Sequence, residues 1–313
     1  MKKYAFGVDI GGTTVKMGLF ETVGTLLDTW EIPTRIQENG RYILPDIADA
    51  VTCKMEEKKI SRLDIEGIGM GVPGPVSPDG TVLKCVNLGW GVFNVEEELK
   101  RLTGFKVKAG NDANVAALGE MWQGGGKGCR NLVMVTLGTG VGGGVIIDGK
   151  ILPGTVGAAG EIGHIPMCDD ETEVCGCGKK GCLEQYASAT GIVRLTGRYL
   201  EEHKEEHAQT ILKDHYTAKD IFDAAKQGDK IALAMVDEVG RMLGKALASI
   251  ACVVNPEVFV IGGGMAKAGE ILLNAIRKYY MEYAFHAARD TAFKEAELSN
   301  NAGIYGGVRL VLE

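Results

Sequence analysis

The chain has 313 residues, of which 45% are apolar and 24% charged, and its net charge is −7 at pH 7. This composition excludes wholesale disorder, and the length favours two domains. The acidic balance argues against a nucleic-acid-binding protein, so no nucleic-acid partner is expected. No apolar stretch is long enough to cross a bilayer or to form a signal peptide, which predicts a cytoplasmic protein without membrane contact.

Two similar patterns of strand, glycine turn and strand occur along the chain. Strands are expected at residues 4–10, 15–20, 132–137 and 145–147. Placing Gly11 on Gly138 superimposes the two patterns, which suits an internal duplication in a two-domain chain.

Helical spacing of apolar residues follows each pattern. Helix starts are expected at Asn94 and Thr217, and a long helix is expected from Asp229 to about Cys252. Residues 258–261 read as a buried strand that ends in three glycines. Alternating strands and helices predict an α/β fold.

Three glycine-rich loops follow apolar strands and are candidates for phosphate binding. Their residues are Asp9, Gly11, Gly12, Thr13, Thr14 and Lys16, then Gly138, Thr139 and Gly140, then Gly262, Gly263 and Gly264. Glycine lets backbone N–H groups approach an anion, and a carboxylate such as Asp9 can hold Mg²⁺ through water. Each loop alone is as well explained as a tight turn, but three together favour a polyphosphate ligand.

Cysteines cluster between residues 168 and 182. Cys175, Cys177 and Cys182 have interleaved glycines that let three sulfur atoms face one point. Three thiolates and one further ligand make a tetrahedral zinc site, and the spacing leaves His164 and Cys168 open as the fourth ligand. A cluster of reduced thiols is the alternative.

Several polar residues suit a sugar, whose hydroxyls both donate and accept hydrogen bonds. Asp112 precedes an apolar helical run, where a helix cap is the simpler interpretation. Glu161 and His164 share a glycine-flanked segment, and Glu184 follows Cys182 by two residues. A metal in the cysteine loop would hold His164 and Glu184 near each other.

Together these motifs resemble the ROK family of bacterial sugar kinases and sugar-responsive repressors, over essentially the whole chain. The similarity rests on the phosphate loop at residues 9–16, the segment 137–164 and the cysteine motif at 175–184. Residues 87–90 and 110–114 are most similar to the family's glucokinases.

The resemblance implies an actin-like (ribonuclease H-like), two-lobed sugar kinase fold with ATP in the cleft and a structural zinc loop. The lobes expected are residues 1–111, joined by about 300–313, and residues 112–299, which contain the zinc loop 164–184. The resemblance also implies Mg²⁺ as a cofactor and a homodimer.

The resemblance implies the following residue roles. Asp112 is the general base, and His164 completes the zinc site with Cys175, Cys177 and Cys182. The expected sugar-binding residues are Gly74, Asn87, Asn111, Asp112, Glu161, His164 and Glu184. The expected reaction is transfer of the ATP γ-phosphoryl group to the 6-hydroxyl of glucose.

Two alternatives remain open in the sequence. Fructose, mannose, N-acetylmannosamine or another hexose can replace glucose, because the polar residues separate these sugars poorly. A sugar-responsive transcriptional regulator is the second alternative. Such a regulator would need a DNA-binding module before the phosphate loop, and we expect no room for one because that loop begins at Asp9.

Overall fold

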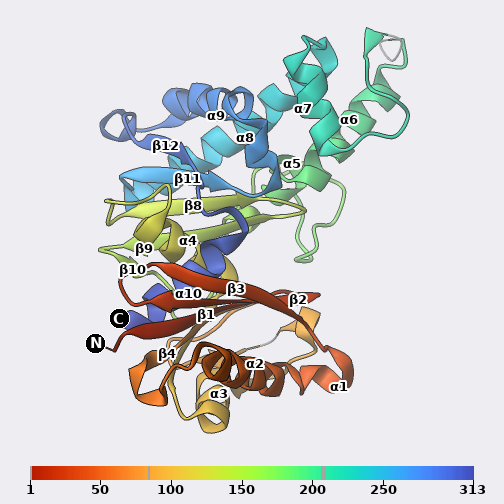
Figure 1. Ribbon diagram of the computed structural model, residues 1–313. Helices are drawn as coiled ribbons and strands as arrows, with labels where there is room; N and C mark the ends of the chain where they lie inside the picture. Colours follow the sequence, from red (N-terminus) through yellow and green to blue (C-terminus); the bar gives the residue numbers. More distant parts are fainter. Residues whose placement is uncertain (1, 84, 206–208) are drawn as a thin grey trace. The chain divides into compact units, whose positions relative to one another are not determined.

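The computed structural model describes residues 2–83, 85–205 and 209–313 (Figure 1). The chain forms two compact units. The first comprises Met1–Leu132, Gly144–Gly160 and Glu297–Glu313, and the second Val133–Gly143 and Glu161–Ala296. Residues 112–132 thus group with the first unit, and the expected lobe boundary after residue 111 stays a prediction.

A five-stranded sheet forms the centre of the first unit, in the order β3-β2-β1-β4-β7. Its strands are β1 Tyr4–Ile10, β2 Thr14–Glu21, β3 Leu26–Pro33, β4 Ile65–Val72 and β7 Lys106–Asn111. The first three are antiparallel neighbours, whereas β4 runs parallel to both β1 and β7. A small antiparallel pair, β5 Thr81–Val82 and β6 Phe93–Asn94, lies outside this sheet.

Helices cover both faces of the first sheet (Figure 1). They are α1 Gln37–Gly40, α2 Ile43–Lys58, α3 Val95–Thr103, α4 Asp112–Gln123 and α10 Ala302–Leu312, with short 3-10 turns η1 Arg62–Asp64, η2 Val86–Leu88 and η7 Ser299–Asn301. Phe6 packs on the face of the sheet that α2 covers, and the adjacent Ala5 packs on the opposite face against α10, because successive side chains of a strand point to opposite faces.

Helix α10 lies unusually close to the sheet because glycines line the contact. A Cβ on Gly69 of β4 would clash with the backbone oxygen of Gly307, and one on Gly306 would clash with that of Val115 in α4. Missing side chains on both sides therefore let α10 pack directly against the backbones of β4 and α4.

A second five-stranded sheet has the order β10-β9-β8-β11-β12. Its strands are β8 Leu132–Leu137, β9 Val141–Ile147, β10 Lys150–Ile151, β11 Val258–Gly262 and β12 Ala292–Glu295. Matching β8 with β1 and β9 with β2 reproduces the order of the first sheet. The predicted internal duplication is therefore visible in the strand topology.

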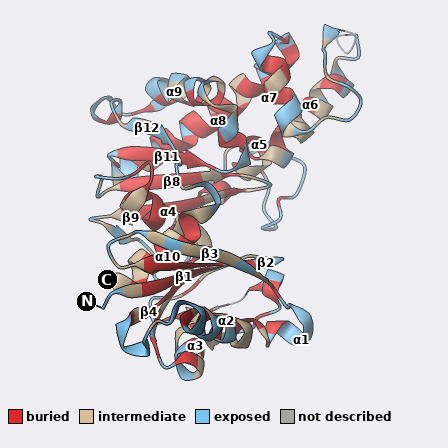
Figure 2. Ribbon diagram, viewed as in Figure 1, coloured by how far each residue is buried: buried red, intermediate tan, exposed pale blue. Residues whose placement is uncertain are grey.

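The second unit is rich in helices: α5 Glu184–Ala187, α6 Ala189–Glu202, α7 Ala218–Lys226, α8 Lys230–Val254 and α9 Glu270–Tyr283, with 3-10 turns η3 Ile162–His164, η5 Gly264–Ala268 and η6 His286–Ala288. The predicted long helix is α8, capped by Asp229, and the predicted start at Thr217 is a capping box with Asp220. Figure 2 shows that buried residues concentrate in the central strands and on the inner side of α8.

One predicted strand begins earlier than expected. β9 starts at Val141 and includes the glycines at 142–144, so the turn before it is confined to residues 138–140. A Cβ on Gly144 would lie 2.6 Å from the Cβ of Ala117 in α4, so this glycine serves close packing within a strand. No helix among the described residues is both long and apolar enough to cross a membrane.

Candidate active site

Asp9 and Asp112 lie near each other at one end of the first sheet. Asp9 is on β1, opposite Lys16 of β2 and Gly71 of β4, and Asp112 is the first residue of α4. A Cβ on Gly71 would lie 3.3 Å from the Cα of Asp112 and 3.5 Å from Oδ1 of Asp9. The two carboxylates therefore flank a position without a side chain.

The environment of Asp9 disfavours its charged form. Burial and then the charge of Asp112 raise the pKa of Asp9 to about 6, although Lys16 acts in the opposite direction. A cation beside the two carboxylates would relieve their repulsion, and carboxylate oxygens are ligands that Mg²⁺ prefers. The donor set around Asp9 therefore fits the expected Mg²⁺.

The start of α4 fixes Asp112 and Asn111. Asn111 is the helix cap: its Oδ1 accepts the N–H of Asn114 at 3.2 Å, and its Nδ2 donates to the Gly74 carbonyl at 3.2 Å. Asp112 follows in the first turn, where Oδ1 accepts the N–H of Ala113 at 2.8 Å. The simple interpretation of Asp112 as the cap is therefore wrong by one residue, because the cap is Asn111, whose side chain contacts Gly74.

Asn87 lies in the short turn η2 and its side chain is exposed. Burial raises the pKa of the neighbouring Cys85 thiol, the amide of Leu88 opposes this, and the charge of Asp112 raises it further. The segment that carries Asn87 is thus within electrostatic reach of Asp112.

The first glycine loop is a tight turn between β1 and β2. The N–H of Gly11 donates to the carbonyl of Thr14 at 2.9 Å, and the hydroxyl of Thr34 donates to the carbonyl of Gly11 at 2.7 Å. Gly12, Thr13 and Thr14 are exposed. This turn presents amides and hydroxyls beside Asp9 and Lys16, as a phosphate site needs.

The other two glycine loops line one cavity of about 520 Å³ in the second unit. This volume lies in the usual range for small-molecule sites. Its wall combines apolar side chains with the basic side chains of three lysines. The lining residues are Gly138, Thr139, Ala189, Thr217, Ala218, Lys219, Phe222, Asp223, Lys226, Gly264, Met265, Lys267 and Ala268. An adenine base suits the apolar wall, and phosphates suit the glycine amides and lysines.

Not every predicted glycine faces this cavity. Within 262–264 only Gly264 lines it. Gly263 has a φ of 86° and a Cβ there would lie 2.5 Å from the carbonyl oxygen of Leu137, so its role is close packing against β8. A Cβ on Gly140 would overlap Oε2 of Glu184, which couples the second loop to a predicted sugar ligand.

His164, Cys175, Cys177 and Cys182 form a candidate metal centre, with ligand atoms all within 4.8 Å of one another. Cys177 Sγ is 3.5 Å from Cys182 Sγ, and Cys175 Sγ is 3.8 Å from Nδ1 of His164. Zn–S bonds of about 2.3 Å and Zn–N bonds of about 2.0 Å in a tetrahedron place ligand atoms roughly 3.5–3.8 Å apart. The donor set and spacing therefore fit Zn²⁺, and Cys168 lies outside the group.

Without a metal ion, the surroundings of Cys182 favour its neutral thiol. Burial, followed by hydrogen bonds with Cys177 and Cys175, raises the pKa of Cys182 to about 12. A divalent ion reverses this preference, because it stabilises thiolates directly.

Glu184 connects the cluster to the second glycine loop. Its Oε2 accepts the N–H of Val141 at 3.0 Å, and its Oε1 lies 3.8 Å from Cys175 Sγ. Glu161 is exposed, and its carbonyl accepts the N–H of His164 at 3.1 Å. In the second unit, Glu184 thus contacts both the second glycine loop and the cysteine cluster, and Glu161 contacts His164 of that cluster.

A buried ionic network behind the cysteine loop was not foreseen from the sequence. Glu171 accepts hydrogen bonds from Tyr186 at 2.7 Å and Arg194 at 3.0 Å, and pairs with Arg198 at 3.2 Å. Burial alone would raise the pKa of Glu171, but hydrogen bonds from Arg194, Tyr186 and the Glu173 amide lower it to about 2. The network fastens the cysteine loop to α5 and α6.

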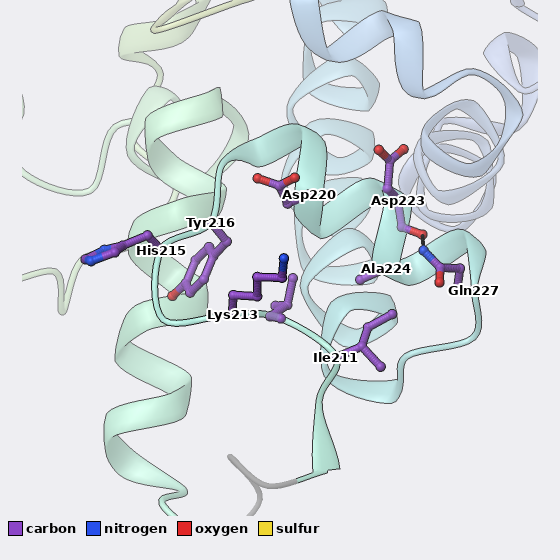
Figure 3. A pocket seen from close by; sticks show the side chains of 9 residues that line it. Ile211, Lys213, His215, Tyr216, Asp220, Asp223, Ala224 and Gln227 are labelled. Carbon is purple, nitrogen blue, oxygen red and sulfur yellow. Dashed lines mark hydrogen bonds between the residues drawn. The ribbon is translucent and has the colours of Figure 1, made fainter.

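A second cavity, of about 480 Å³, was also not foreseen. It lies against α7, and Figure 3 shows Lys213 directed toward that helix. Asp220, Asp223, Ala224 and Gln227 line it from α7 and its end, whereas Lys219, Phe222 and Lys226 of the same helix line the 520 Å³ cavity. Helix α7 therefore contributes to both.

Comparison with known proteins gives one consistent relationship. The chain matches the ROK family over residues 5–313. The glucokinase of Halalkalibacterium halodurans is 46% identical over 99% of this chain and 95% of its own length. A ROK family glucokinase from Streptomyces griseus, solved with glucose and AMPPNP, has a TM-score of 0.76 and 34% identity over 98% of both chains. A xylose repressor from Caldicellulosiruptor bescii is 28% identical, and this chain covers 77% of it. The chain belongs to the ROK family and has the actin-like fold of its sugar kinases.

Proposed function

We propose that this protein is a glucokinase, which transfers the γ-phosphoryl group of ATP to the 6-hydroxyl of glucose. The observation that carries the proposal is 46% identity to a glucokinase along nearly the full length of both chains. A carboxylate pair, a nucleotide-sized cavity and the Cys/His cluster supply the parts such a reaction needs. Another hexose or a regulatory role is not favoured.

In this proposal Asp112 is the general base. It accepts the proton of the 6-hydroxyl as the bond from that oxygen to the γ-phosphorus forms and the bond to the ADP oxygen breaks. A positioned base contributes about 10²–10⁴ in rate, and orientation of the oxygen contributes further. Asp112 lies in the first turn of α4, where the helix dipole interacts favourably with an acidic side chain.

We assign the hexose to Gly74, Asn87 and Asn111 of the first unit and to Glu161, His164 and Glu184 of the second. Support comes from the fixed orientation of two of these groups. Asn111 is held by Gly74, and Glu184 is held by the amide of Val141. Donors and acceptors with fixed orientations can form hydrogen bonds to sugar hydroxyls of one stereochemistry without first having to reorganise.

We assign the nucleotide to the 520 Å³ cavity and to the exposed turn at Gly11–Thr14. Asp9 would hold Mg²⁺, which neutralises phosphate charge when bound. Lys16, opposite Asp9 on β2, adds positive charge at the same level of the sheet.

We propose that the Cys/His cluster is a structural zinc site. All four positions are filled by His164, Cys175, Cys177 and Cys182, so none is open for substrate. Nδ1 of His164 is the ring nitrogen nearest Cys175, which leaves Nε2 for a sugar hydroxyl. The site would therefore act on the reaction by fixing the His164 ring.

We further propose a cytoplasmic homodimer, as the family resemblance implies. Val253 of α8, Met281 of α9 and Phe285, which follows α9, are exposed apolar side chains, and helices α8 and α9 pack together. We assign these side chains to the surface that the second copy would cover. Light scattering after size-exclusion chromatography tests this, and a monomer at micromolar concentration would oppose it.

A hexose panel tests the proposed function. The full chain, with ATP and Mg²⁺, is assayed by ADP release against glucose, mannose, fructose, N-acetylmannosamine and N-acetylgalactosamine. We expect the highest kcat/KM with glucose. A preference of tenfold or more for another sugar would replace glucose as the substrate, and ADP release with no sugar would refute a sugar kinase.

A further inference from the structure

Glu120 is a fully buried carboxylate that none of the sequence motifs singles out. Among the described residues, three backbone amides donate hydrogen bonds to its carboxylate. Gly125 donates to Oε2 at 2.8 Å, Glu297 donates to Oε2 at 3.0 Å, and Leu298 donates to Oε1 at 2.8 Å. Charge-assisted hydrogen bonds of this kind are among the strongest in proteins.

The geometry requires a carboxylate at this position. The substitution Glu120→Gln would place an NH₂ group either against the amides of Gly125 and Glu297 or against that of Leu298, so a donor would face a donor in both orientations. The space is also closed, because a Cβ on Gly124 would overlap Oε2 of Glu120.

The three amides place Glu120 at a junction of the first unit. Glu120 lies in the last turn of α4, whose first residue is Asp112. Residues 297 and 298 are where the chain re-enters the first unit, just before α10. Glu120 therefore fastens the end of α4 to the segment that leads into α10.

Helix α10 in turn rests against Asp9 and α4. A Cβ on Gly303 would lie 2.5 Å from Oδ2 of Asp9, and one on Gly119 of α4 would clash with the carbonyl of Ala302. Because these contacts have no free space, a shift at the start of α10 must move the surroundings of Asp9 and the axis of α4.

We infer that Glu120 is a positioning residue for phosphoryl transfer, which acts by fixing α10 and α4 so that Asp9 and Asp112 keep their mutual geometry. This inference rests on the proposed function for the reaction itself, while the positioning is a property of the first unit. The carboxylate touches neither substrate nor phosphate in this account.

The test uses three variants of the full chain. Glu120→Gln removes one acceptor, Gly124→Ala displaces the carboxylate while keeping its charge, and Glu297→Gln is the matched control. The Glu297 side chain is exposed, and the control keeps the amide that binds Glu120. Measurements are kcat, the KM values for glucose and ATP, and hydrogen exchange of backbone amides.

For Glu120→Gln and Gly124→Ala we expect kcat to fall roughly 10–100-fold, the cost of a misplacement near 1 Å, with the glucose KM within about twofold. Amide exchange should accelerate at residues 297–303 and also at 9–12 and 112–115. The control should match the wild type in every measurement. If Glu120→Gln does not fold, Gly124→Ala carries the test.

Exchange that accelerates only at 297–303 with kcat unchanged would overturn the inference and leave Glu120 a purely structural residue. If the wild type phosphorylates no sugar, the proposed function fails separately. In that case acceleration at 9–12 and 112–115 still supports the positioning role, and its absence refutes it.

Discussion

Replacing Asp9 with Asn should stabilise the protein while abolishing its activity. The ordinary pKa of this carboxyl is 3.8, and burial together with Asp112 raises it to about 6. Each pKa unit corresponds to about 1.36 kcal/mol, so ionised Asp9 destabilises the folded protein by up to about 3 kcal/mol. The folded state binds the Asp9 proton more tightly than the unfolded state does. Protonated Asp9 therefore gives the folded protein its full stability below pH 3.8, and this contribution is lost as the pH rises through about 6.

The assay is urea unfolding of the wild type and Asp9→Asn without Mg²⁺. At pH 8 we expect the variant to be more stable by up to about 3 kcal/mol, and at pH 5 by about half of that. Asp49→Asn is the control, because it removes the same charge from an exposed position on α2. Turnover should be lost in Asp9→Asn and kept in the control.

If Asp9→Asn is no more stable than the wild type at pH 8, or if its advantage does not shrink at lower pH, ionised Asp9 does not destabilise the folded protein. Mg²⁺ offers a second check. It should stabilise the wild type more than Asp9→Asn, since binding to the folded state raises stability.

Three further predictions follow from the site. Asp112→Asn should lower kcat by about 10²–10⁴ while the Kd for glucose, measured by calorimetry, changes little; equal loss of both would contradict a base. Cys177→Ser should lose bound zinc, measured by elemental analysis, together with glucose binding; a zinc-free variant with normal turnover would separate the cluster from the sugar. Gly140→Ala should raise the glucose KM by roughly 10–100-fold, as expected for loss of a hydrogen bond to the displaced Glu184 carboxylate. Gly138→Ala, where a Cβ meets no heavy atom within 4 Å, should instead affect the KM for ATP, and equal effects on glucose would argue against the Glu184 role.

Local patterns predicted most of the architecture. The strands β1, β8 and β11 and the long helix α8 agree with the expected ranges within a residue or two, because apolar periodicity and capping residues are local signals. The matching order of the two sheets also follows from the repeated hairpins. The Cys/His cluster was predictable because three of its ligands lie within eight residues of chain.

Long-range contacts could not be predicted in this way. Glu120 meets amides more than 170 residues away, and Glu171 meets arginines on a later helix. Neither carboxylate stands in a recognisable pattern, and both acquire their partners only through tertiary packing. The early start of β9 was missed for a related reason: glycines indicate a turn locally, whereas Gly144 is required by contact with α4.

Transfer of the γ-phosphoryl group of ATP to the 6-oxygen of glucose can be observed directly in the products. Phosphorus and carbon NMR of the products from ¹³C-labelled glucose, ATP and Mg²⁺ tests it most directly. We expect ADP and a single phosphomonoester coupled to carbon 6. Phosphate on another carbon, or inorganic phosphate with unchanged glucose, would contradict it.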